Sequence, residues 1–151
     1  LERAVGGGEA GDGQRDRAEN LCRNAERGGA KLVTGGHRLN QPGSFLAPTV
    51  FSDVSSDMEI AQTEVFGPVL TLLKTTSGAE AIEIANGTEY GLVGGIFTAD
   101  IDAAHRAARQ IRAGQIFINE WFAGGVEAPF GGYGKSGDGR EKGHEALWNY
   151  V

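Results

Sequence analysis

Residues 129–143 are rich in glycine and contain a lysine and a serine in an order that phosphate-binding loops use. Residues 132–137 fit the pattern G-x-G-x-x-G, and the Gly-Lys-Ser run at 134–136 is similar to the end of a Walker A loop. The Walker pattern requires glycine where this chain has Pro129, and the dinucleotide pattern must join a strand directly to a helix. The last strand candidate ends near Asn119. These residues argue against a phosphate loop, and a nucleotide-binding module is kept only as a third hypothesis.

Cys22 is the only cysteine and therefore the only thiol that could act as a nucleophile. A reactive cysteine needs a lowered pKa, which a helix N-terminus or a neighbouring cation can supply. Cys22 instead shares the apolar stripe of a helix with Leu21 and Ala25, so the sequence predicts a buried structural thiol. A single cysteine allows no internal disulfide, which is typical of proteins in a reducing compartment.

The remaining composition excludes several classes of function. The net charge of −6 argues against a nucleic-acid partner, because phosphate backbones are bound by clustered Lys and Arg. Apolar runs such as 69–73 are too short to cross a bilayer, so no membrane association is expected. The three histidines, His37, His105 and His144, have no metal-ligand spacing, and we expect no metal site. A soluble cytoplasmic protein is the expectation.

The hydrophobic pattern alternates between amphipathic helices and short strands. Residues 1–13, rich in Gly and charge, are expected to form a disordered lead-in, followed by a helix over 14–27. Ser56 and Ser77 are each followed three residues later by Glu, a capping-box pattern that predicts helix starts at both serines. A further helix is expected over 100–112.

Five segments have the pattern of strands: 31–34, 45–54, 69–74, 93–98 and 115–119. Pro48 favours an edge or irregular strand over 45–54, because proline cannot donate to a sheet ladder. The continuous apolar run at 69–74 is typical of a strand buried on both faces. Strands and helices that alternate with short connections predict right-handed crossovers. We therefore expect one compact α/β unit with a mostly parallel, open sheet and helices on both faces.

Four motifs then occur in one order with short spacings. They are Thr-Glu-Val-Phe-Gly-Pro-Val at 63–69, Asn-Gly-Thr-Glu-Tyr-Gly-Leu at 86–92, Ala-Gly-Gln-Ile-Phe-Ile-Asn at 113–119, and 129–141, which begins Pro-Phe-Gly-Gly and ends Ser-Gly-Asp-Gly-Arg-Glu. Together they resemble the C-terminal part of the catalytic domain of an NAD(P)-dependent aldehyde dehydrogenase. The resemblance covers residues 14–151 and leaves 1–13 outside.

In that family a cysteine thiolate attacks the aldehyde to give a thiohemiacetal, hydride passes to the nicotinamide, and a glutamate activates water. The resemblance therefore implies an oxidoreductase that converts an aldehyde substrate to a carboxylic acid with NAD or NADP. It also places the nucleophile, the general base and the Rossmann-like cofactor domain before the segment covered here. Cys22 does not match the surroundings of the family's nucleophile. We expect a fragment that has no catalytic residue of its own and is inactive alone.

The resemblance transfers roles to five residues. Glu64 and Phe66 match the pair that contacts the nicotinamide ribose and the nicotinamide ring. Phe130, Trp121 and Phe122 lie near the aldehyde tunnel, where aromatic walls would exclude water and select the shape of the substrate. From the residues alone, Glu64 ending a helix and Phe66 packing in the core would be the simpler interpretation.

The family continues after residues 145–151 into a strand that pairs across a subunit interface, so the resemblance implies a homo-oligomer. Without that strand we expect exposed sheet edges and apolar surface that favour association of the isolated chain. A non-catalytic scaffold or interaction domain derived from the same fold is the alternative hypothesis for the whole chain.

Overall fold

The computed structural model describes residues 11–122 and 124–151. Most of the predicted lead-in, up to residue 10, therefore lies outside the described residues. The chain divides between Lys74 and Thr75 into two compact units, whereas the sequence predicted one. Each strand pairs only with strands of its own unit, which explains the division.

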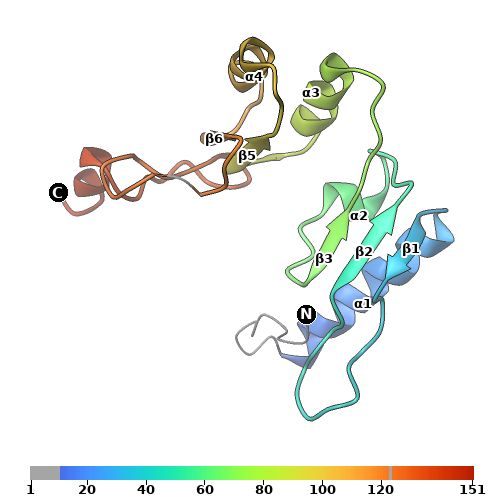
Figure 1. Cartoon of the computed structure of the whole chain (residues 1–151). Helices are drawn as coiled ribbons and strands as arrows, with labels where there is room; N and C mark the ends of the chain where they lie inside the picture. The colour runs from blue at the N-terminus through green and yellow to red at the C-terminus, as the bar shows by residue number, and fades with distance from the viewer. Residues whose placement is uncertain (1–10, 123) are drawn as a thin grey trace. The chain divides into compact units, whose positions relative to one another are not determined.

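The first unit contains a three-stranded sheet in the order β1-β2-β3. Its elements are α1 (Asp12–Arg27), β1 (Lys31–Thr34), β2 (Thr49–Ser52), α2 (Glu59–Gln62) and β3 (Val69–Thr71). Strands β1 and β2 are antiparallel, whereas β2 and β3 are parallel. In Figure 1, α1 lies behind this sheet. The apolar stripe of α1 contributes Leu21 and Cys22 to a core that also contains Phe51 of β2 and Ile60 of α2.

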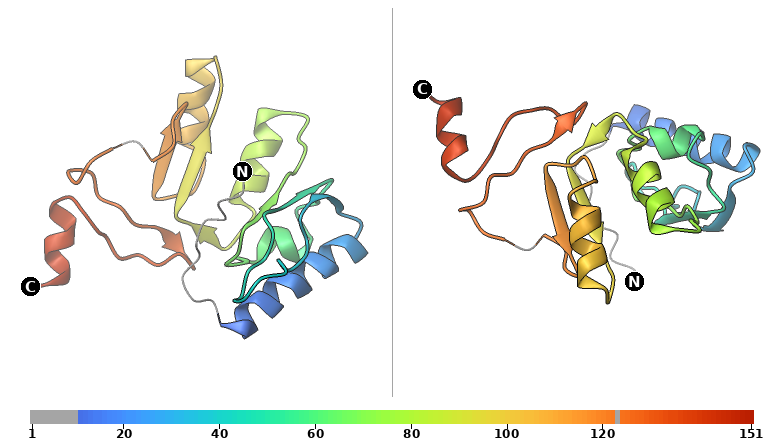
Figure 2. Two further views of the ribbon diagram at one scale, coloured as in Figure 1. Left: turned by 60° about the horizontal axis from the view of Figure 1, so that its bottom comes forward. Right: turned by 90° about the horizontal axis from the view of Figure 1, so that it is seen from above.

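The second unit contains two separate strand pairs. Its elements are α3 (Gly78–Asn86), β4 (Tyr90–Gly91), β5 (Val93–Ile96), α4 (Ile101–Ala108), β6 (Gln115–Ile118), β7 (Tyr133–Gly134) and the 3₁₀ helix η1 (His144–Asn149). Strands β5 and β6 are parallel, and β4 pairs antiparallel with β7. Figure 2 shows α4 running alongside β5 and β6. Among the described residues of this unit, Ala104 and Phe117 are the buried hydrophobic side chains.

The α/β prediction is confirmed, because both crossover pairs, β2–β3 and β5–β6, are parallel and every sheet is open. Three local predictions were wrong. Residues 45–54 do not form an edge strand: β2 is central, because Pro48 precedes it and removes no hydrogen bond from its ladder. Residues 69–74 are not buried on both faces, since β3 is the edge strand and Leu70 is 56% exposed.

The third wrong prediction concerns the two capping boxes. Ser77 caps α3 as predicted, accepting a hydrogen bond from the Glu80 amide at 3.1 Å. Ser56 does not cap α2, which begins at Glu59 after Met58 and has no side-chain cap. The capping pattern therefore located only one of the two helix starts.

Glu19 is the charged side chain buried in the first unit, at 6% exposure on the inner side of α1. The Arg38 guanidinium donates to its carboxylate at 2.8 Å, and Arg23 lies 3.6 Å away. The hydrogen bond from Arg38 holds the pKa of Glu19 below its ordinary value of 4.5, against the opposing effect of burial. This ion pair ties the loop after β1 to α1.

We expect Glu19→Gln to lower the free energy of unfolding by about 1.5–3 kcal/mol at neutral pH, because the charge that accepts the Arg38 hydrogen bond on the buried side of α1 is lost. A carboxyl whose pKa is lowered on folding stabilises the protein fully above its unfolded pKa. That contribution disappears as the pH falls through the lowered folded value. The gap between variant and wild type should therefore shrink from about pH 5 downward.

Urea unfolding at a series of pH values measures this gap. Glu26→Gln is the matched control, because Glu26 is an exposed residue of the same helix. A gap that stays constant down to about pH 3 would show that the charge of Glu19 contributes nothing.

Candidate functional site

The loop after α2 presents two of the predicted site residues outward. Val65 is buried in the core of the first unit, and its two neighbours, Glu64 and Phe66, are exposed. Phe66 is 60% exposed and has a φ of 53°, a left-handed conformation that is uncommon for a bulky residue. The Gln14 side chain donates to the Phe66 carbonyl at 3.0 Å and ties this loop to α1. Phe66 is therefore not a core residue, because more than half of it is exposed.

The three aromatic residues predicted for the substrate side meet in the second unit. Ring centroids of Trp121 and Phe122 lie 5.5 Å apart, and those of Phe122 and Phe130 lie 6.4 Å apart. Phe117 of β6 joins them, 5.7 Å from Trp121 and 5.6 Å from Phe122. We call Phe117, Trp121, Phe122 and Phe130 the aromatic cluster. Trp121 and Phe122 are more than half exposed, whereas Phe117 is buried and forms the base.

Two backbone features hold the rings of the aromatic cluster in place. A Cβ atom at Gly95 of β5 would lie 2.7 Å from the Trp121 indole, so the indole rests against bare backbone. Phe130 and Glu141 exchange two backbone hydrogen bonds, of 2.6 and 2.7 Å. The contributions of Phe117 and Gly95 to the aromatic cluster were not predicted from the sequence. The alternation in β6 could have indicated Phe117, since it faces away from Ile116 and Ile118.

The glycine-rich turn does not offer a phosphate cradle. The Ser136 hydroxyl accepts a hydrogen bond from the Gly91 amide at 3.1 Å, and Lys135 pairs with Glu89, which raises the pKa of the lysine. Arg140 donates to three carbonyls of the turn itself, those of Gly132, Asp138 and Gly139. Ser136, Lys135 and Arg140 therefore make contacts that hold the turn in place.

Cys22 is 1% exposed, which confirms the prediction of a buried thiol. Burial raises the pKa of Cys22, and Glu26 and Glu19 raise it further, so the protonated thiol is favoured. A thiolate nucleophile requires the opposite environment.

Within residues 11–122 and 124–151 no three acidic, cysteine or histidine side chains gather to hold a metal ion. No helix in the described part of the chain is long and apolar enough to cross a membrane.

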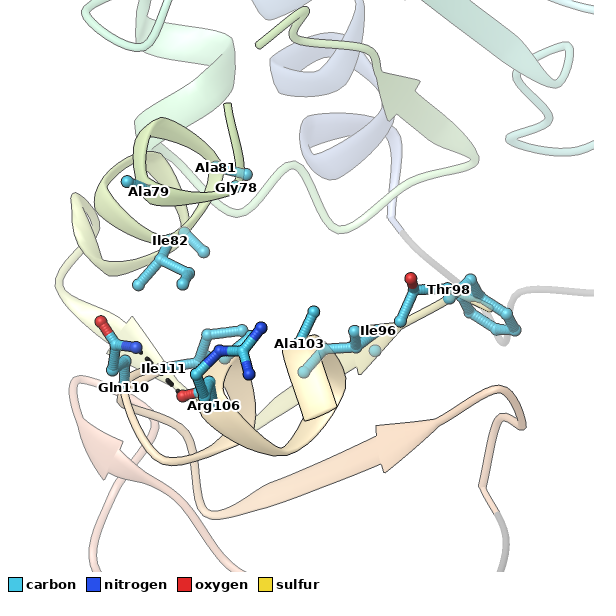
Figure 3. A pocket seen from close by; sticks show the side chains of 14 residues that line it. Gly78, Ala79, Ala81, Ile82, Ile96, Thr98, Ala103, Arg106, Gln110 and Ile111 are labelled. Carbon is cyan, nitrogen blue, oxygen red and sulfur yellow. Dashed lines mark hydrogen bonds between the residues drawn. The ribbon is translucent and has the colours of Figure 1, made fainter. Parts of the chain in front are cut away.

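An open groove of about 620 Å³ lies between α3, β5 and α4. Figure 3 shows Ile82 of α3 facing Ile111 across it, with the Gln110 amide bonded to the Arg106 carbonyl at one side. Its lining is largely apolar and includes no carboxylate, cysteine or histidine. The groove can pack against apolar groups, and no carboxylate, cysteine or histidine that could serve as a general base or thiol nucleophile lines it.

The chain matches the model of the aldehyde dehydrogenase family over residues 7–151. It belongs to that family. The match extends the resemblance into residues 7–13, which the four motifs had left outside.

Individual members of the family are similar over most of this chain. It is 48% identical to the mitochondrial benzaldehyde dehydrogenase of Antirrhinum majus over 85% of the chain and 24% of that protein. It is 44% identical to the betaine aldehyde dehydrogenase of Sinorhizobium fredii over 91% of the chain and 29% of that protein. The NAD+ complex of the Bacillus cereus aldehyde dehydrogenase superimposes with a TM-score of 0.88 at 42% identity, covering 93% of this chain and 28% of that one. The chain thus spans less than a third of each of these three aldehyde dehydrogenases.

Proposed function

We propose that this chain is the C-terminal part of the catalytic domain of an aldehyde dehydrogenase that oxidises an aldehyde to a carboxylic acid with NAD or NADP. The aromatic cluster carries this proposal. Trp121, Phe122 and Phe130 form an aromatic wall over the buried Phe117, and such a wall suits an apolar aldehyde. Trp121, Phe122 and Phe130 are the proposed substrate contacts, with Phe117 as their base.

Glu64 and Phe66 are the proposed cofactor contacts. Both side chains are exposed on one short loop, and their chemistry fits the nicotinamide half of the cofactor. The Glu64 carboxylate can accept hydrogen bonds from two ribose hydroxyls, and the Phe66 ring offers an apolar face to the nicotinamide. Glu64 and Phe66 would hold the nicotinamide half of the cofactor, whose chemistry there would be hydride acceptance. The strained φ of Phe66 is the kind of backbone cost that collects at ligand contacts.

We further propose that the chain contains neither the nucleophile nor the general base and is inactive alone. The burial of Cys22 and the raised pKa of its thiol support this, since the thiol can neither reach an aldehyde nor ionise readily.

We also propose a cytoplasmic homo-oligomer. Exposed apolar residues on β3 and near the last residue, such as Leu70, Trp148 and Tyr150, are available for subunit contacts.

A chimera tests the cofactor contacts. In it, this chain replaces the matching C-terminal segment of the Bacillus cereus aldehyde dehydrogenase. We expect aldehyde-dependent NADH formation, and a KM for NAD raised about tenfold by Glu64→Gln, because a charged acceptor of ribose hydroxyls is lost. Phe66→Ala should raise the same KM by a similar factor, because the apolar face is lost.

Glu26→Gln, an exposed change on α1, is the control and should leave the KM for NAD unchanged. Steady-state kinetics at varied NAD measures all three variants. A chimera that folds but forms no NADH would contradict the proposed function. An active chimera whose KM for NAD is unchanged by both substitutions would contradict only the two assigned contacts.

A further inference from the structure

The rings of the aromatic cluster contact one another directly. Their centroids lie 5.5–6.4 Å apart, within the range of direct ring–ring contact. An aromatic cage for a quaternary ammonium ion works differently, because several ring faces must surround the cation. Here the Trp121 and Phe122 rings meet edge to face at 79°. A flat ring can extend such an array through the same edge-to-face or tilted contacts.

A cation of the chain itself already lies over one of these rings. The Lys142 ammonium is 5.7 Å from the centroid of Phe130, in the position that a cationic ligand would take. Lys142 directly follows Glu141, whose backbone pairs with that of Phe130. The lysine is thus held beside the ring by the same bridge that fixes the ring.

The backbone around the aromatic cluster is also strained. Asn119, Phe122 and Lys142 have φ values of 55°, 56° and 58°. Non-glycine residues in the left-handed region are uncommon and collect at ligand-binding and active sites. Three of them within or beside one aromatic cluster indicate that the ring and lysine positions are enforced by the fold.

We propose that the aromatic cluster selects aromatic aldehydes without a positive charge, and that Lys142 is the residue that discriminates against cationic ones. The inference rests on the proposed function, since it assigns the substrate class of the same aldehyde site. The aldehyde ring stacks on Trp121 and Phe122. A cationic substituent meets the Lys142 ammonium, which repels it and already covers the face of Phe130.

Two aromatic aldehydes of equal shape test the charge discrimination, and a third aldehyde without a ring tests the preference for an aromatic substrate. The probes are 4-tert-butylbenzaldehyde, its cationic isostere 4-(trimethylammonio)benzaldehyde, and 3,3-dimethylbutanal, which lacks the ring. Each is titrated into the full chain carrying Trp148→Phe, so that the indole N–H signal in the NMR spectrum reports on Trp121 alone. We expect the neutral aromatic aldehyde to bind more tightly than both of the others.

Lys142→Gln removes the charge, and Lys142→Arg retains it. In the glutamine variant, the affinity for the cationic aldehyde relative to that for its neutral isostere should rise by about two- to fivefold, which corresponds to an exposed cation–π contact. The relative affinity for the two isosteres should not change in the arginine variant. The affinity for 4-tert-butylbenzaldehyde should stay the same in both variants, which would exclude a general disturbance of the site.

Equal binding of the two isosteres, or a ratio that Lys142→Gln leaves unchanged, would overturn the role of Lys142. Binding of 3,3-dimethylbutanal as tight as that of the aromatic aldehyde would overturn the preference for a ring. If no aldehyde moves the Trp121 signal, the proposed aldehyde site itself fails and the inference fails with it. The outcomes therefore separate the failure of the proposed function from the failure of this inference.

Discussion

Gly114→Ala is expected to destabilise the second unit by about 3 kcal/mol or more. A Cβ atom at Gly114 would lie 1.6 Å from the carbonyl oxygen of Gly131, a separation that no side-chain movement can relieve. Both groups belong to backbone, so the glycine-rich turn would have to move away from the start of β6. Since Gly131 directly follows Phe130, we also expect the aromatic cluster to be disturbed.

Urea unfolding gives the change in stability, and the Trp121 indole signal reports on the aromatic cluster. Gly139→Ala is the matched control in the same turn: its Cβ would meet no atom within 4 Å, and its φ is not in the left-handed region. It should change the free energy of unfolding by less than about 0.5 kcal/mol. The close approach of the two backbones would be refuted if Gly114→Ala were as stable as this control.

The glycines illustrate what the sequence could and could not predict. The sequence showed that residues 129–143 need an unusual backbone, and it correctly argued against a phosphate loop. It did not indicate which glycines are required, because the contact of Gly114 with Gly131 joins two segments whose distance is set by the fold. Local patterns predict turns, whereas a close approach between segments depends on tertiary structure.

Helices and strands were predicted best where local signals agreed. The capping pattern at Ser77 predicted a helix start, and the structure has the helix at Gly78–Asn86. Ser56 had the capping pattern without a long amphipathic run, and α2 is only the short segment Glu59–Gln62. Burial was predicted less well, because whether a strand such as β3 is central or at an edge is decided by strand order.

The candidate site was also predicted in part. The family resemblance singled out Trp121, Phe122 and Phe130, and the structure brings these rings together. Lys142 carried no signal in the sequence, because its proximity to Phe130 depends on the backbone bridge between residues 130 and 141. The roles of Glu64 and Phe66 remain proposals, although the structure places both side chains at the surface.

The second large effect expected is a complete dependence of activity on residues outside this chain. The isolated chain should form no NADH from NAD and an aldehyde, while the chimera with the Bacillus cereus enzyme is active. Cys22→Ala should leave the activity of that chimera unchanged, because the thiol is buried in the core of the first unit and its pKa is raised. A modest loss of stability is the only cost expected of this substitution.

The most direct test is NADH formation by the isolated chain, with the reactivity of Cys22 toward a thiol reagent followed in the same sample. We predict no aldehyde-dependent NADH above the protein-free rate, and a thiol that reacts only when the chain is unfolded. Aldehyde-dependent NADH formation that is abolished by Cys22→Ala would contradict the claim that this chain forms one wall of an active site without its nucleophile.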